Sequence, residues 1–273
     1  NYLGLRRTIA NRVKKTSRGP NKVSLPRAIS KLGSASRSQA LQLIQGGRVI
    51  VNGRVERNPH RWVNLLADTI KVDNELLTKQ PFRYIILNKP RGLVTSRADE
   101  RDRATVFDIL EEEGKGLAPV GRLDKDTTGL LLFTNDHQLA NLLISPESGV
   151  EKTYLATVDR DVDEKDLQRC ADGMEIEGRG KVIRTKPAVV KLKGQRLAEI
   201  TLTEGRNRQV RRMFEALGYQ VVDLKRTSIG PLELGDLREG ESRDLSHAEI
   251  EQLRSAVARG DLHTTRSRSN AME

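Results

Sequence analysis

The N-terminal part of the chain breaks into short apolar runs separated by turn residues, which predicts two helices, a hairpin and a strand. Residues 25–33 (LPRAISKLG) carry a proline suited to a first helical turn and end in a glycine. Residues 36–47 (SRSQALQLIQGG) set alanine, leucine and isoleucine on one helical face between a serine N-cap and two glycines. Residues 48–56 (RVIVNGRVE) hold two β segments around Asn-Gly, a strong hairpin signal, and residues 68–73 (DTIKVD) predict a further strand.

From Arg83 onward, strand-like and helix-like patterns alternate. This mixed order predicts an α+β fold, in which a small helix-helix-hairpin domain is followed by a larger domain with a mixed, mainly antiparallel sheet. A last helix is opened by the capping box Ser246-x-x-Glu249. The clearest strand patterns are 84–90 (YIILNKP), 151–159 (EKTYLATVD) and 197–204 (LAEITLTE), and the clearest helix patterns are 137–144, 163–171 and 207–218.

The changes of pattern also predict how the chain is divided. Residues 1–22 mix basic and polar residues with Gly and Pro, and we expect a flexible basic arm there. The small domain is expected over 23–77 and the large domain over 83–258, with a linker between them. The polar tail 259–273 is expected to be disordered.

The charge of the chain predicts an anionic binding partner. The formal net charge is +11 and the pI is about 9.9, and the segment from Asn1 to Val55 contains twelve Lys or Arg and no acid. Such a one-sided block is typical of nucleic-acid binding. A solvated basic face is the plainer interpretation. Binding to a membrane surface is the weaker alternative, because no long amphipathic helix carries the charge.

The sequence excludes several kinds of chemistry. Cys170 is the single cysteine, so the chain has no internal disulfide and no zinc site built from several thiolates. Neither phosphate-binding glycine motif, GxxxxGK[ST] or GxGxxG after a strand, occurs. No apolar stretch is long enough to span a membrane. From these absences we expect a cytoplasmic protein without metal or cofactor. We also expect a monomer.

The stretch 120–136 (VGRLDKDTTGLLLFTND) carries the richest candidate chemistry. Arg122, Asp124 and two further charged residues crowd together just before a run that predicts a buried central strand. Gly121 and Gly129 flank them and would let a ligand approach the backbone. Asp124 is thus a candidate catalytic carboxylate, held ionised by nearby cations. The alternative is a tight turn in which Asp124 only caps backbone N–H groups.

Several short motifs follow one another along the large domain. They are Leu87-Asn88-Lys89-Pro90-x-Gly92, Gly121-Arg122-Leu123-Asp124 with Thr127-x-Gly129-Leu130-Leu131-Leu132 and Thr134-Asn135-Asp136, Glu151-Lys152-x-Tyr154, the run 204–213 (EGRNRQVRRM), and Leu224-Lys225-Arg226. In this order they resemble the motifs of bacterial ribosomal RNA pseudouridine synthases of the RsuA/RluB type. One small departure is His137, where the family usually has glycine. On Ser36-Arg37, on 47–53 (GRVIVNG) and on Asp68-x-Ile70, the segment 23–77 resembles the small RNA-binding domain named after the fourth small-subunit ribosomal protein.

This resemblance implies an enzyme that isomerises uridine to pseudouridine in ribosomal RNA or in an assembly intermediate of the ribosome. Asp124 is then the essential carboxylate on a flipped-out uridine. Three routes stay open: attack on the ribose, addition to the base, or removal of a ribose proton. Arg211 is expected to pair with Asp124, although it could instead belong to a basic helix that touches only phosphate. Tyr154 is expected to stack on the base, with core packing as its alternative.

The remaining site residues follow from the same resemblance. Leu224 would wall the pocket, and Arg122 would occupy the space that the flipped base leaves. Gln209 is expected to contact the substrate, and Arg206 and Arg208 to contact phosphate. By charge, the RNA-docking residues of the small domain are expected to be Arg27, Lys31, Arg37 and Arg48.

Two other functions remain open at this stage. The chain could be an RNA-binding assembly factor of the ribosome that kept the fold without turnover. Replacement of Asp124, Tyr154 or Arg211 would favour that function, but all three are present. A synthase acting on another structured RNA, such as transfer RNA, is the second alternative.

Overall fold

The computed structural model describes residues 22–78, 81–96, 103–178 and 180–269. The chain divides into two units, Asn1–Gln80 and Pro81–Glu273, which we call the small and the large unit. Apart from Lys22, the expected basic arm lies outside the described residues.

The small unit has the expected order of helix, helix, hairpin and strand, so this prediction is confirmed. One sheet has the order β3-β2-β5-β6, and β1 pairs with β4 in a separate two-stranded sheet that the sequence patterns did not predict. The elements are β1 (Lys22–Ser24), α1 (Leu25–Lys31), α2 (Arg37–Gln45), β2 (Val49–Val51), β3 (Arg54–Val55), β4 (Trp62–Asn64), β5 (Ile70–Val72) and β6 (Glu75–Leu76).

Local chemistry explains these elements. Ser36 caps α2 in a capping box, because its hydroxyl accepts from the backbone of Gln39 while the Gln39 side chain accepts from the backbone of Ser36. Asn52 and Gly53 both have positive φ, 52° and 80°, as the two-residue hairpin turn between β2 and β3 requires. The helices bury Ala28, Ile29, Ala40 and Ile44 against the strands.

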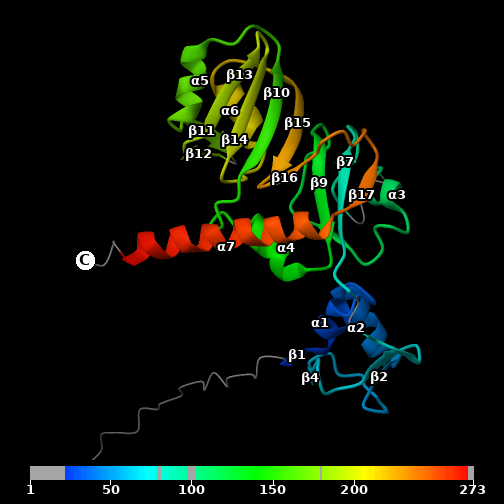
Figure 1. The fold of residues 1–273 in the computed structure, drawn as a ribbon. Coiled ribbons are helices and arrows are strands. Elements are labelled where there is room, and N and C mark those ends of the chain that lie inside the picture. The colour runs from blue at the N-terminus through cyan, green and yellow to red at the C-terminus, as the bar shows by residue number, and fades with distance from the viewer. Residues whose placement is uncertain (1–21, 79–80, 97–102, 179, 270–273) are drawn as a thin grey trace, which may run out of the picture. The chain divides into compact units, whose positions relative to one another are not determined.

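The large unit is built on one sheet, and its elements are shown in Figure 1. Its strands are β7 (Tyr84–Lys89), β8 (Ala118–Pro119), β9 (Thr128–Thr134), β10 (Lys152–Val158), β13 (Val189–Gly194), β14 (Leu197–Leu202), β15 (Val221–Ile229), β16 (Leu232–Glu233) and β17 (Ser242–Asp244). Beside the sheet lie the hairpin β11 (Glu175–Gly178) and β12 (Lys181–Arg184), and the helices α3 (Phe107–Leu110), α4 (His137–Ile144), α5 (Glu164–Ala171), α6 (Gln209–Ala216) and α7 (His247–Ser269).

The order of the main strands is β13-β14-β10-β15-β9-β7-β17, with β16 paired to β15 and β8 to β9. Within this sheet the described strands pair antiparallel, except that β9 and β15 are parallel. The expected mixed, mainly antiparallel sheet is therefore confirmed. None of the helices in the described part of the chain has the length and apolarity needed to span a bilayer.

Strand β9 is buried along its whole length, as the apolar run in its sequence predicts. Its side chains alternate between two cores. Leu130 and Leu132 pack with α4 and α7, whereas Leu131 and Phe133 pack with α3. A third core joins α5 and α6 to β10, β14 and β15. The loop before β9 therefore leads into a rigid strand.

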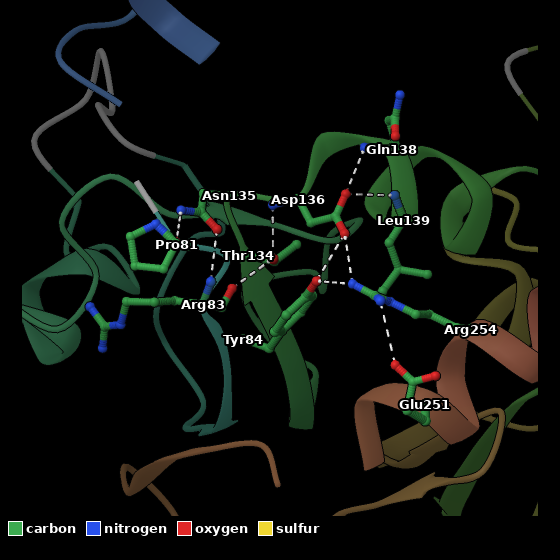
Figure 2. Close-up of polar contacts among 10 residues, drawn as sticks. All are labelled: Pro81, Arg83, Tyr84, Thr134, Asn135, Asp136, Gln138, Leu139, Glu251 and Arg254. Carbon is green, nitrogen blue, oxygen red and sulfur yellow. Dashed lines mark hydrogen bonds and ion pairs between the residues drawn. The ribbon is translucent and has the colours of Figure 1, made fainter. Parts of the chain in front are cut away.

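The end of β9 is fixed by a buried polar network (Figure 2). Asp136 accepts from the hydroxyl of Tyr84 at 2.8 Å and caps α4 through the backbone N–H of Gln138 and Leu139. Arg254 of α7 donates to the same Tyr84 hydroxyl at 3.1 Å and lies 3.7 Å from the carboxylate of Asp136. The Thr134-Asn135-Asp136 part of the motif therefore joins β7, α4 and α7.

Two expectations differ from the structure. Helix α7 continues to Ser269, whereas disorder is expected from residue 259; residues 259–269 contain no proline and a single glycine, so nothing in the chain forces the helix to end earlier. Gly129 makes room for another strand rather than for a ligand. Its φ is +100°, and a Cβ there would lie 2.2 Å from the carbonyl oxygen of Arg226 in β15.

Candidate active site

A cleft of about 280 Å³ lies where the loop before β9 meets β10, β15 and the loop before α6. These strands are neighbours in the sheet (Figure 1). The cleft brings together residues from distant parts of the sequence. Its lining includes seven of the expected site residues: Arg122, Asp124, Tyr154, Arg206, Arg208, Gln209 and Leu224.

Asp124 stands on a loop that is held at both sides. The backbone N–H of Thr127 donates to the carbonyl of Asp124 at 3.0 Å and closes a tight turn. The Thr95 hydroxyl donates to the carbonyl of Leu123 at 2.8 Å and accepts from the N–H of the same residue. The carboxylate itself is 38% exposed, so it is available to a ligand in the cleft.

Lys89 lies beneath this loop and is fully buried. Its ammonium donates to the carbonyls of Pro90 at 3.0 Å, Lys125 at 3.4 Å and Thr127 at 2.9 Å. Burial lowers the pKa of Lys89 to about 8, although the nearby carboxylates of Asp126 and Asp124 oppose that shift. The sequence places Lys89 in a motif but does not predict that it supports the loop that carries Asp124.

The cation nearest to Asp124 among the described ion pairs is Arg208, whose Nη1 lies 4.0 Å from Oδ2. Arg208 is the residue before α6 and has a φ of 53°, in the left-handed region. This backbone conformation is costly for a residue with a Cβ. A strained residue that aims a cation into a cleft is a candidate for function.

Arg211 is placed differently from the expectation. No direct ion pair joins it to Asp124 within the described residues. Its guanidinium is buried and donates to the carbonyls of Val221 at 2.8 Å and Asp126 at 2.9 Å. Burial lowers the pKa of Arg211, the charge of Arg208 adds to the shift, and Asp126 and Asp124 oppose it. Arg211 therefore contacts the backbone of the loop that carries Asp124, and its charge lies near that carboxylate.

The loop before α6 is organised by a buried acid that sequence analysis did not single out. Glu204 accepts from the backbone of Lys186 at 2.9 Å, from Arg206 at 3.0 Å and from Gln209 at 2.7 Å. Burial alone would raise the pKa of Glu204, but these hydrogen bonds outweigh it and lower the pKa. Gln209 also accepts from the backbone of Arg206, so it shapes the loop from within.

The other residues of the cleft give it one apolar wall and one polar rim. Tyr154 on β10 is half-buried and packs against two of the three cores. Leu224 on β15 is buried beside it. Arg122 is exposed on the loop that carries Asp124. The wall is suited to a flat apolar ring, and the rim to an anion.

The expected RNA-docking residues of the small unit are exposed. Arg27 and Lys31 are one turn apart on α1, and Arg37 begins α2. Arg48 differs from them, because its guanidinium donates to both carboxylate oxygens of Asp73 at 2.6 Å. That interaction competes with any phosphate.

A cysteine nucleophile can be set aside in this chain. Cys170 is buried, and burial raises the pKa of its thiol to about 12. At neutral pH the sulfur therefore stays a thiol rather than the reactive thiolate.

Comparison with known proteins gives two family matches. The model described as RNA pseudouridylate synthase matches residues 83–216, and that of the S4 domain matches residues 23–64. A solved structure described as a crystal structure of pseudouridylate synthase is also similar. It has a TM-score of 0.62 and 38% identity, and the match covers 85% of this chain and 99% of that chain.

Individual relatives match over most of their length. The ribosomal large subunit pseudouridine synthase B of Bacillus subtilis is 37% identical over 239 residues, which cover 86% of this chain and 97% of that protein. The ribosomal small subunit pseudouridine synthase A of Haemophilus influenzae is 40% identical over 221 residues, which cover 80% of this chain and 94% of that protein.

Proposed function

The chain belongs to the family of RNA pseudouridine synthases, and from this premise we propose that it isomerises specific uridines of ribosomal RNA with Asp124 as the reacting carboxylate. The relatives named for the two ribosomal subunits support ribosomal RNA as the substrate. The observation that carries the catalytic part is the position of Asp124, in a cleft with Tyr154 on one wall and Arg208 on the rim.

The reaction needs no atoms from outside the substrate. The bond between ribose C1′ and uracil N1 breaks, the base turns, and a bond forms between C1′ and C5. The proton on C5 leaves, and N1 takes up a proton, so the balance closes without an oxidant or reductant. A carboxylate can serve this sequence by attacking C1′, by adding to the base, or by removing a ribose proton. Each route requires Asp124 to be ionised and in contact with the nucleoside.

The apolar wall supplies a place for the base. Tyr154 would stack on the uracil ring, a contact that contributes about 1–3 kcal/mol, and Leu224 would close the pocket behind it. A uridine in folded RNA must leave its stack before it can reach such a wall. Arg122, exposed two residues before Asp124, would occupy the space that the base leaves.

The cations of the site divide into two roles. Arg208 and Arg206 are partly exposed on the rim, 41% and 42%, and would bind phosphates of the flipped nucleotide and its neighbours. Arg211 and Lys89 are buried and hold the loop that carries Asp124 through its backbone carbonyls. They would keep Asp124 in position and add positive potential around it.

The small unit would dock on a structured part of the RNA. Arg27, Lys31 and Arg37 are exposed, and the match to the S4 domain covers all three. Contacts of this kind position a protein on RNA without reading the base sequence. Arg48 would join them only after it leaves Asp73.

Mapping pseudouridines in ribosomal RNA tests the proposal. Cells that lack this protein should lose modification at one position or a small set of positions. Wild-type protein should restore it, and the Asp124→Asn variant should not. An unchanged map in cells without the protein would refute ribosomal RNA as the substrate. Purified protein, given naked RNA or isolated assembly intermediates, would then show which form is modified.

A further inference from the structure

The small unit exposes the chain's only tryptophan. Trp62 lies in β4 and is 43% exposed, although tryptophan is among the most buried residue types on average. Aromatic residues make up only 3% of the chain, so this one is not part of a generally aromatic surface. An exposed indole on a short strand is a candidate for contact with a partner.

The register of the two-stranded sheet shows what shares this face. Ser24 of β1 lies opposite Trp62, Val23 opposite Val63, and Lys22 opposite Asn64. Directly opposed residues of an antiparallel pair share a face, and the valine pair is buried in the core. Trp62 and the exposed Lys22 therefore lie on the outer face of the same small sheet.

Cations gather around this face. Arg61 adjoins Trp62 in the chain and is 38% exposed, and its backbone carbonyl accepts from Leu25 next to β1. Hydrogen bonds from Asn52 and Asn64 lower the pKa of Asp68, and the charges of Arg61 and Lys22 add to that shift, so both cations lie close to one point.

The surrounding sequence increases the positive charge. Arg57 is exposed, and it is followed by His60 in the segment that leads into β4. Residues 1–21, which precede Lys22 in the chain, contain six Lys or Arg and no acid. The acid Glu56 is engaged by Arg61 at 2.7 Å. A flat apolar ring within a cationic surface complements an unpaired base with its phosphates.

We propose that the outer face of β1 and β4 is a second RNA contact of the small unit, in which Trp62 stacks on an unpaired base and Lys22 binds an adjoining phosphate. Arg61 would join them only after it leaves Glu56. This contact is separate from the helical surface of Arg27, Lys31 and Arg37. It rests on RNA as the partner under the proposed function, but not on turnover at Asp124.

The size of the face favours RNA over a protein partner. Strands β1 and β4 have three residues each, so their outer face presents one large apolar side chain. A stable protein interface usually buries about 800 Å² on each partner. A single base needs only one aromatic ring and nearby cations.

Because Trp62 is the only tryptophan, its fluorescence in the full chain reports on this position alone. The probes are single-stranded oligouridylate and a blunt RNA duplex of equal charge, at one fixed ionic strength. We expect oligouridylate to quench the emission and the duplex to leave it almost unchanged. Equal quenching by both probes, or none by either, would overturn the stacking contact.

Variants separate stacking from apolar burial. Trp62→Phe should keep the affinity for oligouridylate within about threefold, whereas Trp62→Leu should weaken it about tenfold. Leu66→Ala, at an 81% exposed site of the same unit, should bind as wild type. Equal affinities of the Phe and Leu variants for oligouridylate would refute the proposal. If the Leu variant did not fold, the quenching of the wild-type fluorescence would test the stacking contact by itself. These experiments measure RNA binding and not turnover. If the protein bound RNA but formed no pseudouridine, that result would contradict the role of Asp124 and would leave the contact at Trp62 standing.

Discussion

Arg208 Nη1 lies 4.0 Å from Asp124 Oδ2, and the two side chains are 41% and 38% exposed. A pair this open contributes little to stability, typically below about 1 kcal/mol. Yet Arg208 keeps a left-handed backbone conformation, with φ 53°, to reach this position. The strain is therefore better explained by a role in the cleft than by the ion pair.

Arg208→Gly and Arg208→Gln test this interpretation as a pair. Both should lower kcat/KM by about 10- to 100-fold, because each removes a charge-assisted contact of about 1.5–3 kcal/mol to the substrate. Only the glycine variant relieves the backbone strain. Its free energy of unfolding should therefore be about 1 kcal/mol higher than that of the glutamine variant. Steady-state kinetics and urea unfolding measure the two effects. Equal activity in wild type and both variants would remove Arg208 from the site.

Lys89→Met should give a stability defect that grows with pH. The pKa of Lys89 is lowered to about 8 in the folded protein and keeps its ordinary value near 10.5 in the unfolded chain. Between these values the unfolded chain binds the extra proton, so the wild-type free energy of unfolding gains up to about 3 kcal/mol as pH rises through this window. Below pH 8 Lys89 is protonated in both states, so the cost of burying its ammonium lowers the wild-type free energy of unfolding in full.

The measurement is the difference in unfolding free energy between wild type and Lys89→Met at pH 7.5 and pH 10. It should be larger at the higher pH. Lys115→Met, at an exposed position, is the matched control. A difference for Lys89→Met that did not change with pH would contradict the assigned shift.

Sequence patterns predicted the elements whose causes are local. The serine N-cap of α2, the Asn52-Gly53 turn and the helix 137–144 depend on residues within a few positions of one another. The buried run of β9 follows from its apolar composition. Strand pairs such as β1 with β4 join short segments far apart in the chain, so no local pattern specifies them.

Gly129→Ala should be strongly destabilising. A Cβ at this position would lie 2.2 Å from the carbonyl oxygen of Arg226, so β9 and β15 would have to separate. We expect a loss of more than about 3 kcal/mol, or no folded protein. Gly116→Ala has a similarly positive φ of 79° but nothing within 4 Å, and should lose only about 1 kcal/mol. Similar losses for the two variants would show that close approach is not the cause.

The RNA-docking residues should differ in how much each contributes to the salt dependence of RNA affinity. Arg27→Gln and Lys31→Gln should each reduce the slope of log affinity against log salt by about one, because each phosphate contact releases counterions. Arg48→Gln should change the slope less, since Asp73 already binds its guanidinium. Asp73→Asn should free Arg48 and steepen the slope. A slope that is the same for all four variants and for wild type would place docking elsewhere.

The site itself was predictable in its residue types but not in its pairings. The family resemblance implied a pair between Arg211 and Asp124, whereas in the structure Arg208 lies nearest to that carboxylate and Arg211 donates to the backbone of Asp126. Arg208 is the left-handed residue just before α6, whereas Arg211 lies within the first turn of that helix. Unlike the positive φ of Asn52 in an Asn-Gly turn, a positive φ at an arginine has no local sequence signal.

The role of Asp124 is tested most directly by the Asp124→Asn variant, which keeps the size of the side chain and removes its charge. Pseudouridine formation on the RNA substrate should be abolished in single-turnover assays, while the affinity for the same RNA stays within about threefold of wild type. Retained affinity without turnover would assign the chemistry to this carboxylate. Turnover at the wild-type rate in the asparagine variant would contradict the account.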